Sequence, residues 1–338
     1  MKTTKKVFLI LLCLMFVGSI SSIIFSKVKA VQDEEVVLRL AHGQAESSLV
    51  AKSVDKLTGK LEANKEMKMG LNIYPSGVLG SEKDMIELVK AGVLDMAKIS
   101  ATALGQFDDY YSIFALPYVF TGVDHYYNSM ENSAAVKEIF NMDKDRGFMA
   151  IGWYASGARN IYTKDKNPVK SPADLKGKKL RVQESSTSMK MIEQMGGSPV
   201  PMTGSETYTA LQQNVIDGAE NTELALTVDK HGELVSSYTY TEHQYSPDIY
   251  IISTNAWNKL PKTQQDFLVK SLKDLNEDYK EVYKEMIKDA TKDAEAMGVK
   301  FYTIDKAPFI EAVQPMHKAF KAKGGNYSKF YDDIQKYK

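Results

Sequence analysis

The sequence feature that most constrains the fold is the stretch 262–297, which contains neither Gly nor Pro. Pro261 precedes it, and proline favours the start of a helix. As one helix this stretch would extend roughly 50 Å at about 1.5 Å per residue, more than the width of a small domain. Its apolar positions are too irregular for the heptads of a coiled coil. Two interpretations remain: the helix is broken within the stretch, or one helix lies across two lobes. We predict a long helix that braces two lobes.

Upstream of this stretch, strand patterns and helix patterns alternate. Runs at 36–41, 68–74 and 94–100 are typical of strands, and helix patterns lie between them at 47–62 and after Ser81. This spacing predicts βαβ units and an α/β fold with a largely parallel sheet. Ligands of such sheets bind beyond the carboxyl ends of the strands. The candidate site residues at those ends are His42, Gln44, Lys98 and Ser100.

Structural roles remain open for two of these candidates. His42 could hydrogen-bond a strand end, and Lys98 could pair with a buried acid, since its strand is otherwise apolar. Neither residue is therefore assigned to a ligand by its position alone.

A chain of 338 residues is too long for one ordinary core, so two domains are expected. Strand-like runs at 148–154 and 158–164 flank Ala155-Ser-Gly157, which we interpret as a hinge where the chain crosses over, and it returns near 247–248. We predict lobe I from 31–156 plus 247–286, and lobe II from 157–246 plus 287–338.

The N-terminus has the pattern of an export signal. Lys2, Lys5 and Lys6 precede a long apolar run, and Val28-Lys29-Ala30 suits signal peptidase. We predict a signal peptide at 1–30 and an exported protein, in the periplasm or on the extracytoplasmic face of the membrane. The alternative is an uncleaved anchor, because the run is long enough to span a bilayer. Cleavage would remove Cys13, the one cysteine of the chain, and with it any disulfide or cysteine metal site.

The charge balance argues against nucleic acid as a partner. Acidic and basic residues number 43 each, but five of the lysines lie in the first thirty positions, which contain no acid. The remainder carries 38 basic against 43 acidic residues and is mildly acidic. A nucleic-acid-binding surface is usually strongly basic.

Arginine is rare, since 39 of the 43 basic residues are Lys. Arg181 ends a strand-like segment just before a helix capped by Ser185 or Ser186, and Arg159 lies 22 residues earlier in another strand-like run. The first turn of a helix favours an anion, and the planar guanidinium binds a carboxylate through two hydrogen bonds. The pair indicates a carboxylate site, with surface salt bridges as the alternative.

Several motifs recur in order over 36–310, nearly all of the predicted mature chain. They are Tyr74-Pro-Ser-Gly-Val-Leu-Gly80, Phe114-Ala-Leu-Pro-Tyr118, Asp174-Leu-Lys-Gly-Lys-Lys-Leu-Arg-Val182, Gly197-Ser-Pro-Val-Pro-Met202, Thr207-Tyr-Thr-Ala-Leu-Gln212 and Asp217-Gly-Ala-Glu-Asn221. In these motifs the chain resembles the solute-binding proteins of tripartite ATP-independent periplasmic (TRAP) transporters. The resemblance implies a two-lobe periplasmic-binding-protein-like fold with crossing strands and a long inter-lobe helix. It also implies a monomer that delivers its ligand to TRAP membrane permease subunits.

The resemblance further implies how a ligand is held. Arg181 matches the arginine that pairs with the ligand carboxylate, Arg159 matches a second arginine facing the ligand, and Asn221 matches an asparagine that hydrogen-bonds the carboxylate. Glu82 falls where relatives present a polar group to ligand hydroxyls, and Glu184 could also accept from hydroxyls. Where many members have a bulky aromatic, this chain has Thr203-Gly-Ser205, which implies a roomier pocket.

Finer features resemble members that bind hexuronates such as glucuronate or galacturonate. They are Ser156-Gly-Ala-Arg-Asn160, Arg181-Val-Gln-Glu-Ser185 and Glu242-His-Gln-Tyr-Ser-Pro-Asp248. Sialic acid and C4-dicarboxylates remain alternative ligands, and a membrane receptor remains an alternative partner.

An exported hydrolase is the competing class of function. The chain lacks Gly-x-Ser-x-Gly and His-Glu-x-x-His, and its five histidines are scattered. Glu82 and Glu184 could be interpreted as a glycosidase pair, but nearby arginines should lower their pKa values, which does not suit a general acid. We expect no enzymatic activity, no metal and no cofactor.

Overall fold

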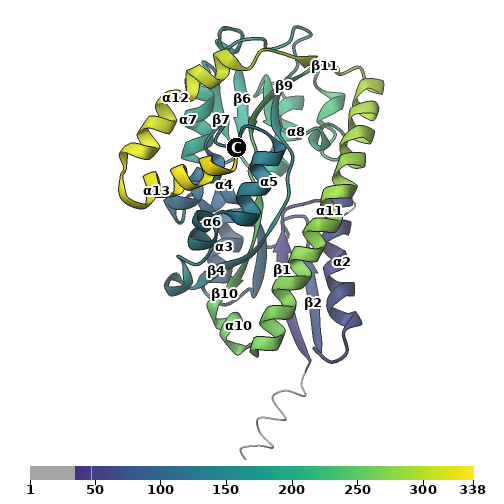
Figure 1. The fold of residues 1–338 in the computed structure, drawn as a ribbon. Coiled ribbons are helices and arrows are strands. Elements are labelled where there is room, and N and C mark those ends of the chain that lie inside the picture. The colour runs from purple at the N-terminus through teal and green to yellow at the C-terminus, as the bar shows by residue number, and fades with distance from the viewer. Residues whose placement is uncertain (1–34, 47) are drawn as a thin grey trace, which may run out of the picture.

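The computed structural model describes residues 35–46 and 48–338. The predicted signal peptide at 1–30 lies outside these ranges. Within them no helix is long and apolar enough to cross a membrane. Figure 1 shows two sheets, each flanked by helices, one above the other. One long helix runs along the side of both.

The first sheet has five strands in the order β2-β1-β3-β10-β4. Strands β1, β2 and β3 run parallel, and β10 is antiparallel to both β3 and β4. Their bounds are β1 Val36–His42, β2 Met69–Tyr74, β3 Met96–Ser100, β4 Phe148–Tyr154 and β10 Asp248–Ser253.

The second sheet has six strands in the order β11-β9-β5-β8-β6-β7. Here β5 is the antiparallel strand, against both β8 and β9. The bounds are β5 Arg159–Thr163, β6 Lys179–Val182, β7 Ser198–Pro201, β8 Gly218–Asn221, β9 Ser237–Gln244 and β11 Lys300–Thr303.

Each antiparallel strand is the one that enters its sheet from the other sheet. The chain leaves β4 for β5 through 155–158 and returns from β9 to β10 through 245–247. A strand that enters at the carboxyl edge of a parallel sheet must run against its neighbours. The predicted hinge is therefore a pair of crossings that joins the carboxyl edges of the two sheets.

Helices cover both faces of each sheet because the strands alternate apolar side chains between the faces. Helices α2 and the first part of α11 pack on one face of the first sheet, and α3 and α6 pack on the other. In the second sheet α7 and α12 pack opposite α8, α9 and the end of α11. The α-helices are α2 Leu49–Ala63, α3 Glu82–Lys90, α4 Ala101–Leu104, α5 Val123–Asn132, α6 Ala134–Phe140, α7 Ser186–Gln194, α8 Gly204–Gln212, α9 Leu224–Thr227, α10 Thr254–Lys259, α11 Lys262–Ala296, α12 Ala307–Ala322 and α13 Gly325–Ile334. Short 3-10 helices are η1 Asp109–Ala115, η2 Lys144–Arg146, η3 Pro172–Leu175, η4 His231–Glu233 and η5 Gln335–Tyr337.

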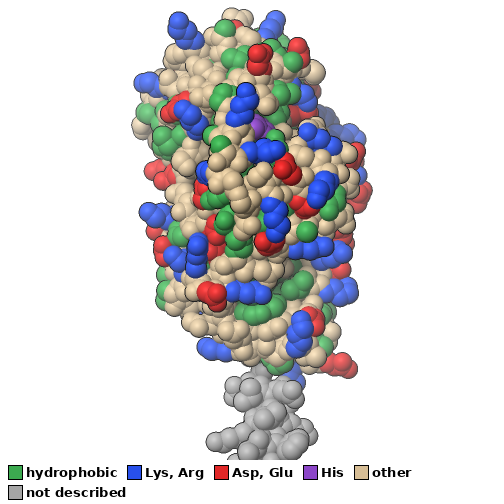
Figure 2. Space-filling view, turned by 60° about the vertical axis from the view of Figure 1, so that its left-hand side comes forward, with side chains coloured by type: hydrophobic (Ala, Val, Ile, Leu, Met, Phe, Trp, Pro, Cys, Tyr) green, Lys and Arg blue, Asp and Glu red, His purple; other side chains and the backbone are tan. Residues whose placement is uncertain are grey.

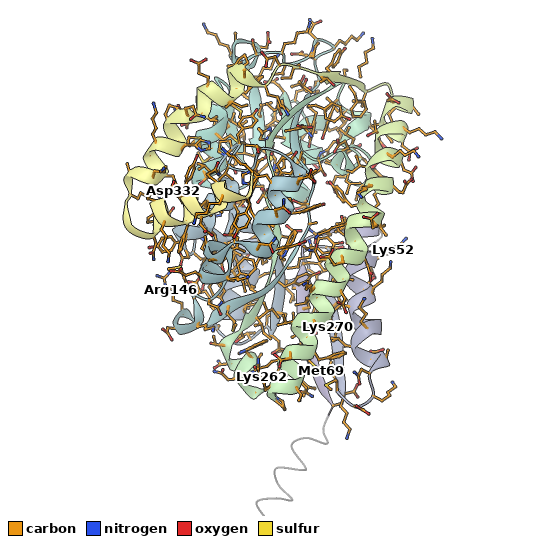
Figure 3. All side chains as sticks on the ribbon, viewed as in Figure 1. Lys52, Met69, Arg146, Lys262, Lys270 and Asp332 are labelled. Carbon is orange, nitrogen blue, oxygen red and sulfur yellow. The ribbon has the colours of Figure 1, made fainter. Side chains whose placement is uncertain are left out.

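The long helix α11 is continuous for 35 residues and ends one residue before the predicted position. It contacts α2 and β4 of the first sheet and α9 beside the second, and Figure 1 shows it running along both layers. Its solvent side carries pairs four residues apart, Lys262–Asp266 at 2.6 Å and Lys270–Asp274 at 2.5 Å. Figure 3 labels Lys262 and Lys270 on this helix.

Helix α11 also binds the crossing segment after β4. The Asn276 side chain accepts a hydrogen bond from the Ala155 amide at 2.8 Å. Gly157 lies so close to Tyr283 that a Cβ at this position would overlap the phenol ring. This close approach explains why the crossing contains a glycine.

These observations confirm the predicted α/β fold of two sheets with crossing strands and a long brace. The lobe boundaries stay a prediction. The C-terminal helices connect the two parts, because α12 packs on α7 whereas α13 packs on α6.

The contact between α13 and α6 depends on Asp333. Its carboxylate accepts hydrogen bonds from Ser133 Oγ at 2.7 Å and the Ala135 amide at 3.0 Å, at the start of α6. Partial burial alone would raise the pKa of Asp333, but these bonds and Lys336 outweigh it and lower the pKa to about 2. A carboxylate at a helix start also stabilises the helix dipole.

We predict that Asp333→Asn lowers the free energy of unfolding at pH 7 by about 1–2 kcal/mol. Because the folded pKa lies below the unfolded value of 3.8, this stabilisation is complete above about pH 4 and is lost as the pH falls towards 2. Denaturant unfolding of parent and variant between pH 7 and pH 3 measures it. Asp332→Asn, at an exposed neighbouring position, is the control. A deficit that does not shrink at low pH would contradict the assignment.

Candidate functional site

The candidate site lies where the carboxyl edges of the two sheets face each other. Because β10 and β5 are antiparallel, their first residues lie at the same edges as their neighbours' last residues. Asp248 thus pairs in register with Ser100, and Arg159 with Gln244. Hydrogen bonds cross between the two sides: Gln183 Nε2 donates to Ser100 Oγ at 3.2 Å.

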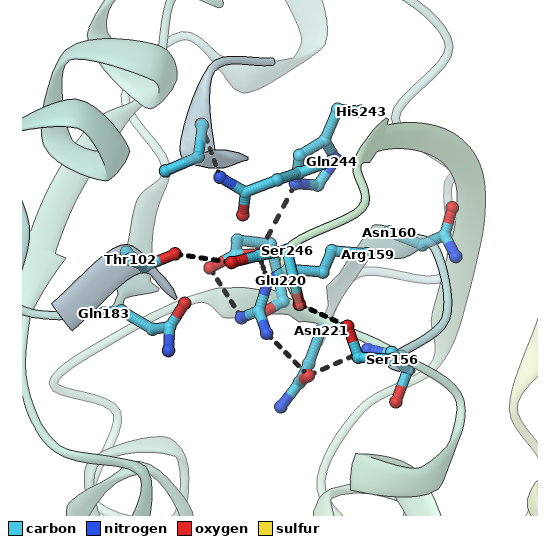
Figure 4. Close-up of polar contacts among 12 residues, drawn as sticks. Thr102, Ser156, Arg159, Asn160, Gln183, Glu220, Asn221, His243, Gln244 and Ser246 are labelled. Carbon is cyan, nitrogen blue, oxygen red and sulfur yellow. Dashed lines mark hydrogen bonds and ion pairs between the residues drawn. The ribbon is translucent and has the colours of Figure 1, made fainter. Parts of the chain in front are cut away.

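Arg159 is buried and its guanidinium is held by the neighbouring strand β8. Nε and Nη2 donate to the Glu220 carboxylate at 2.5 and 2.9 Å, and Nη2 also donates to the Glu220 backbone carbonyl at 2.8 Å. Nη1 donates to Asn221 Oδ1 at 3.0 Å. Figure 4 shows these contacts as one cluster. The charge of Arg159 is therefore balanced by Glu220.

Glu220 is fully buried and ionised. Burial alone would raise the pKa of Glu220, but the charge of Arg159 and hydrogen bonds from His243 and Arg159 outweigh it and lower the pKa to about 2. Burial lowers the pKa of His243, so the imidazole is neutral at pH 7. Thr241 then donates to Nδ1 at 2.8 Å, and Nε2 donates to Glu220 at 3.4 Å.

Arg181 is also buried, with 5% of its surface exposed, but its surroundings differ. Its Nε and Nη2 donate to the Met202 backbone carbonyl at 3.1 and 2.9 Å. In the part of the chain that the structure describes, it forms no ion pair with an acidic side chain. Burial lowers the pKa of Arg181, although the nearby charge of Glu220 acts in the opposite direction. This guanidinium is suited to a bound anion.

The first sheet contributes a second set of charged groups. Lys98 is buried in β3 and forms an ion pair with Asp248, and its Nζ lies 4.8 Å from the centre of the Tyr154 ring. Lys98 therefore has an acidic partner, as its structural alternative expected, but Asp248 is partly rather than fully buried. His42 pairs in register with Lys98 and is fully buried. Burial and then the charge of Lys98 lower the pKa of His42 to about 4.

The His42 ring nitrogens make no hydrogen bond of normal geometry with any described residue. The same is true of Gln44 Oε1, in the loop after β1. Buried polar atoms usually have partners. His42 and Gln44 thus place polar atoms without a partner of normal geometry, among the described residues, at this edge of the first sheet.

Glu82, the first residue of α3, binds Ser100 with both carboxylate oxygens. The Ser100 amide and hydroxyl each donate at 2.7 Å. The expectation that arginines lower the pKa of Glu82 is wrong: burial and then Asp248 raise it. Glu184 is exposed, and the contact that it makes across the interface is through its backbone carbonyl, which accepts from Gln106 Nε2.

The structure thus brings Arg159 and Asn221 into contact and places His42 beside Lys98, whereas the Glu184 side chain lies at the surface. Sequence reasoning did not single out Glu220, Gln183 or Gln244. A signal existed for Glu220, because it precedes Asn221 in the Asp217–Asn221 motif and a buried arginine requires a counter-charge. Among the described residues no group of three or more His, Cys, Asp or Glu is arranged to hold a metal ion.

Two sheets that face each other at the carboxyl ends of their strands, joined by crossing strands, have the architecture of a two-lobe solute-binding protein. The family model "Bacterial extracellular solute-binding protein, family 7" matches residues 40–323. The chain belongs to this family, the solute-binding proteins of TRAP transporters. It is a transport family, as the sequence indicated, and not a family of enzymes.

Individual proteins are similar over nearly the whole chain. YiiZ of Salmonella typhimurium is 37% identical over 89% of this chain and 91% of its own length. A TRAP periplasmic solute-binding protein of Anaerococcus prevotii, solved with bound D-glucuronate, is 37% identical with a TM-score of 0.85, covering 89% of this chain and 98% of that one. One from Bradyrhizobium, in complex with D-galacturonate, is 34% identical with a TM-score of 0.83, covering 88% and 99%.

We predict that Glu220→Gln lowers the free energy of unfolding by about 3–5 kcal/mol, because it leaves the buried Arg159 without a counter-charge. Denaturant unfolding without ligand at pH 7 measures the loss. Glu311→Gln, at an exposed position on α12, is the control and should change stability by less than about 0.5 kcal/mol. Equal stability of the two variants would show that Glu220 does not balance Arg159.

Proposed function

We propose that this protein captures a hexuronate, such as glucuronate or galacturonate, outside the cytoplasmic membrane and delivers it as a monomer to a TRAP permease. The observation that carries the proposal is the buried Arg181, which has no acidic partner among the described residues. The structures with D-glucuronate and D-galacturonate support the same ligand class.

In this proposal Arg181 binds the ligand carboxylate through two charge-assisted hydrogen bonds, and Arg159 and Asn221 complete the site. Glu220 holds Arg159 in place. The sugar hydroxyls face the other sheet, where His42, Gln44, Lys98 and Glu82 supply donors and acceptors. Glu184 would contribute through its contact with Gln106 rather than through its carboxylate.

The charge balance favours a monocarboxylate. Lys98 is paired with Asp248 and Arg159 with Glu220, whereas Arg181 has no acidic partner within 35–46 and 48–338. Burying a second ligand carboxylate here would require a further cation. This argument favours a sugar acid over a C4-dicarboxylate.

The segment next to Arg181 leaves room for a sugar ring in this proposal. Gly204 lies beside Arg181, since a Cβ at this position would be 4.0 Å from Arg181 Nη2. In the Thr203–Ser205 segment a bulky side chain would therefore occupy space next to the guanidinium, which the glycine leaves free. A ring with several hydroxyls needs that space.

Ligand capture would close the two lobes around the predicted hinge. The predicted boundaries place residues 31–156 with 247–286 on one side and residues 157–246 with 287–338 on the other. The predicted signal peptide would export the chain. The mixed surface charge suits a protein free in the periplasm: Figure 2 shows acidic and basic side chains interspersed over one face.

A thermal-shift panel of D-glucuronate, D-galacturonate, sialic acid and succinate tests the ligand class. A ligand at 100 times its Kd adds about 2.7 kcal/mol of stability and raises the melting temperature measurably. We expect a shift with one or both hexuronates. A shift only with sialic acid or succinate would show that the ligand is not a hexuronate and would leave the transport role in place. No shift with any of these carboxylates would favour a membrane receptor as the partner.

We predict that Arg181→Ala weakens hexuronate binding by about 2–5 kcal/mol, because the ligand carboxylate would then be buried without a partner. Isothermal titration calorimetry with parent and variant measures this loss. Arg39→Ala is the matched control, since Arg39 pairs with Asp95 at the far end of the first sheet's strands. Parent-like affinity in Arg181→Ala would overturn the site.

A further inference from the structure

Gln183 follows β6 directly, two residues after Arg181. Only one of the two polar atoms of its side-chain amide has a hydrogen-bond partner among the described residues. Its Nε2 donates to Ser100 Oγ at 3.2 Å across the interface between the sheets. Its Oε1 is buried and accepts no hydrogen bond from any described residue. Ser100 in turn binds the Glu82 carboxyl group, to which its amide and hydroxyl each donate at 2.7 Å.

Hydrogen-bond logic fixes which end of the amide faces Ser100. The Ser100 hydroxyl has one proton, which it donates to the Glu82 carboxyl oxygen Oε2 at 2.7 Å. Its oxygen also accepts from the Ala103 amide at 3.2 Å. Ser100 Oγ can therefore only accept from Gln183, so Nε2 faces Ser100 and Oε1 faces away from it.

An unpartnered buried oxygen is not by itself a site. Gln264 Oε1, on α11, is also unpartnered, but Gln264 is anchored on the Met67 carbonyl, before the start of β2 and not at the carboxyl ends of the strands. Gln244, at the end of β9, does resemble Gln183: its Nε2 is anchored on the Ala115 carbonyl at 2.5 Å, and its Oε1 is unpartnered. Anchored glutamines at the facing edges thus present acceptor oxygens beside the arginines.

We propose that Gln183 determines ligand specificity by accepting a hydrogen bond from a hydroxyl close to the carboxylate that Arg181 binds. Ser100 and Glu82 are positioning residues that fix its amide. A hydroxyl supplies the donor that the buried oxygen lacks, whereas a second carboxylate has no proton to donate and would be repelled. This inference rests on the proposed function. In a hexuronate the hydroxyl concerned is the one on C4, next to the carbon that bears the carboxylate.

The first experiment compares D-glucuronate with 4-deoxyglucuronate by calorimetry on the parent and on Gln183→Met. The parent should bind the deoxy sugar about 10- to 100-fold more weakly, because a buried acceptor is left unpaired. Gln183→Met should lose a similar factor for D-glucuronate and almost nothing further for the deoxy sugar. Gln212→Met, at an exposed glutamine on α8, is the control and should bind like the parent.

A second comparison tests the positioning role. Ser100→Ala alone should weaken D-glucuronate binding. Added to Gln183→Met, the same substitution should change the affinity by less than about threefold. A merely structural Ser100 would cost the same factor in both backgrounds. Melting curves confirm that each variant is folded.

The outcomes separate the two proposals. If the parent binds no hexuronate, the proposed function fails and this inference falls with it. If the parent binds D-glucuronate but neither Gln183→Met nor loss of the 4-hydroxyl weakens binding more than about threefold, only the role of Gln183 is overturned. The deoxy-sugar result on the parent decides the question even if Gln183→Met does not fold.

Discussion

The rest of the structure depends on how the chain passes between its two sheets. Strands β5 and β10 each enter a sheet from the other one, so each lies antiparallel among parallel neighbours. This constraint places the first residues of both strands, Arg159 and Asp248, at the edges where parallel strands end. The site therefore follows from topology: the polar groups of both sheets face each other because the crossings join those two edges.

Among the described residues of the candidate site, the buried cations differ in how their charge is balanced. Arg159 and Lys98 each have a carboxylate partner from an adjacent strand. Arg181 has a backbone carbonyl instead. Burying a charge is costly unless it is paired, which is why we propose that Arg181 rather than Arg159 or Lys98 binds the ligand carboxylate. The strand edges also carry the unpartnered acceptor oxygens Gln183 Oε1 and Gln244 Oε1. An anion has no proton to donate to these oxygens, whereas a ligand hydroxyl has one.

The fold was largely predictable because its signals are local. The capping box formed by Ser81 and Asp84 begins α3 as expected, and Ser185 caps α7 directly after the strand that carries Arg181. The helix after Pro261 runs unbroken to Ala296, since no Gly or Pro interrupts it. By contrast, the packing of α13 on α6 depends on Asp333 and Ser133, which lie 200 residues apart and leave no local pattern.

The sequence by itself determined the α/β class and the long helix α11, because periodicity and capping act over short stretches. The rarity of arginine in the composition drew attention to Arg159 and Arg181. Only the tertiary structure decided which of the two has an acidic partner. Arg159 and Arg181 look alike in sequence, but the first meets Glu220 across a strand pair and the second does not. The roles of Gln183, Ser100 and Glu82 likewise arise from contacts between segments brought together by folding, since no spacing along the chain encodes a hydrogen bond between two sheets.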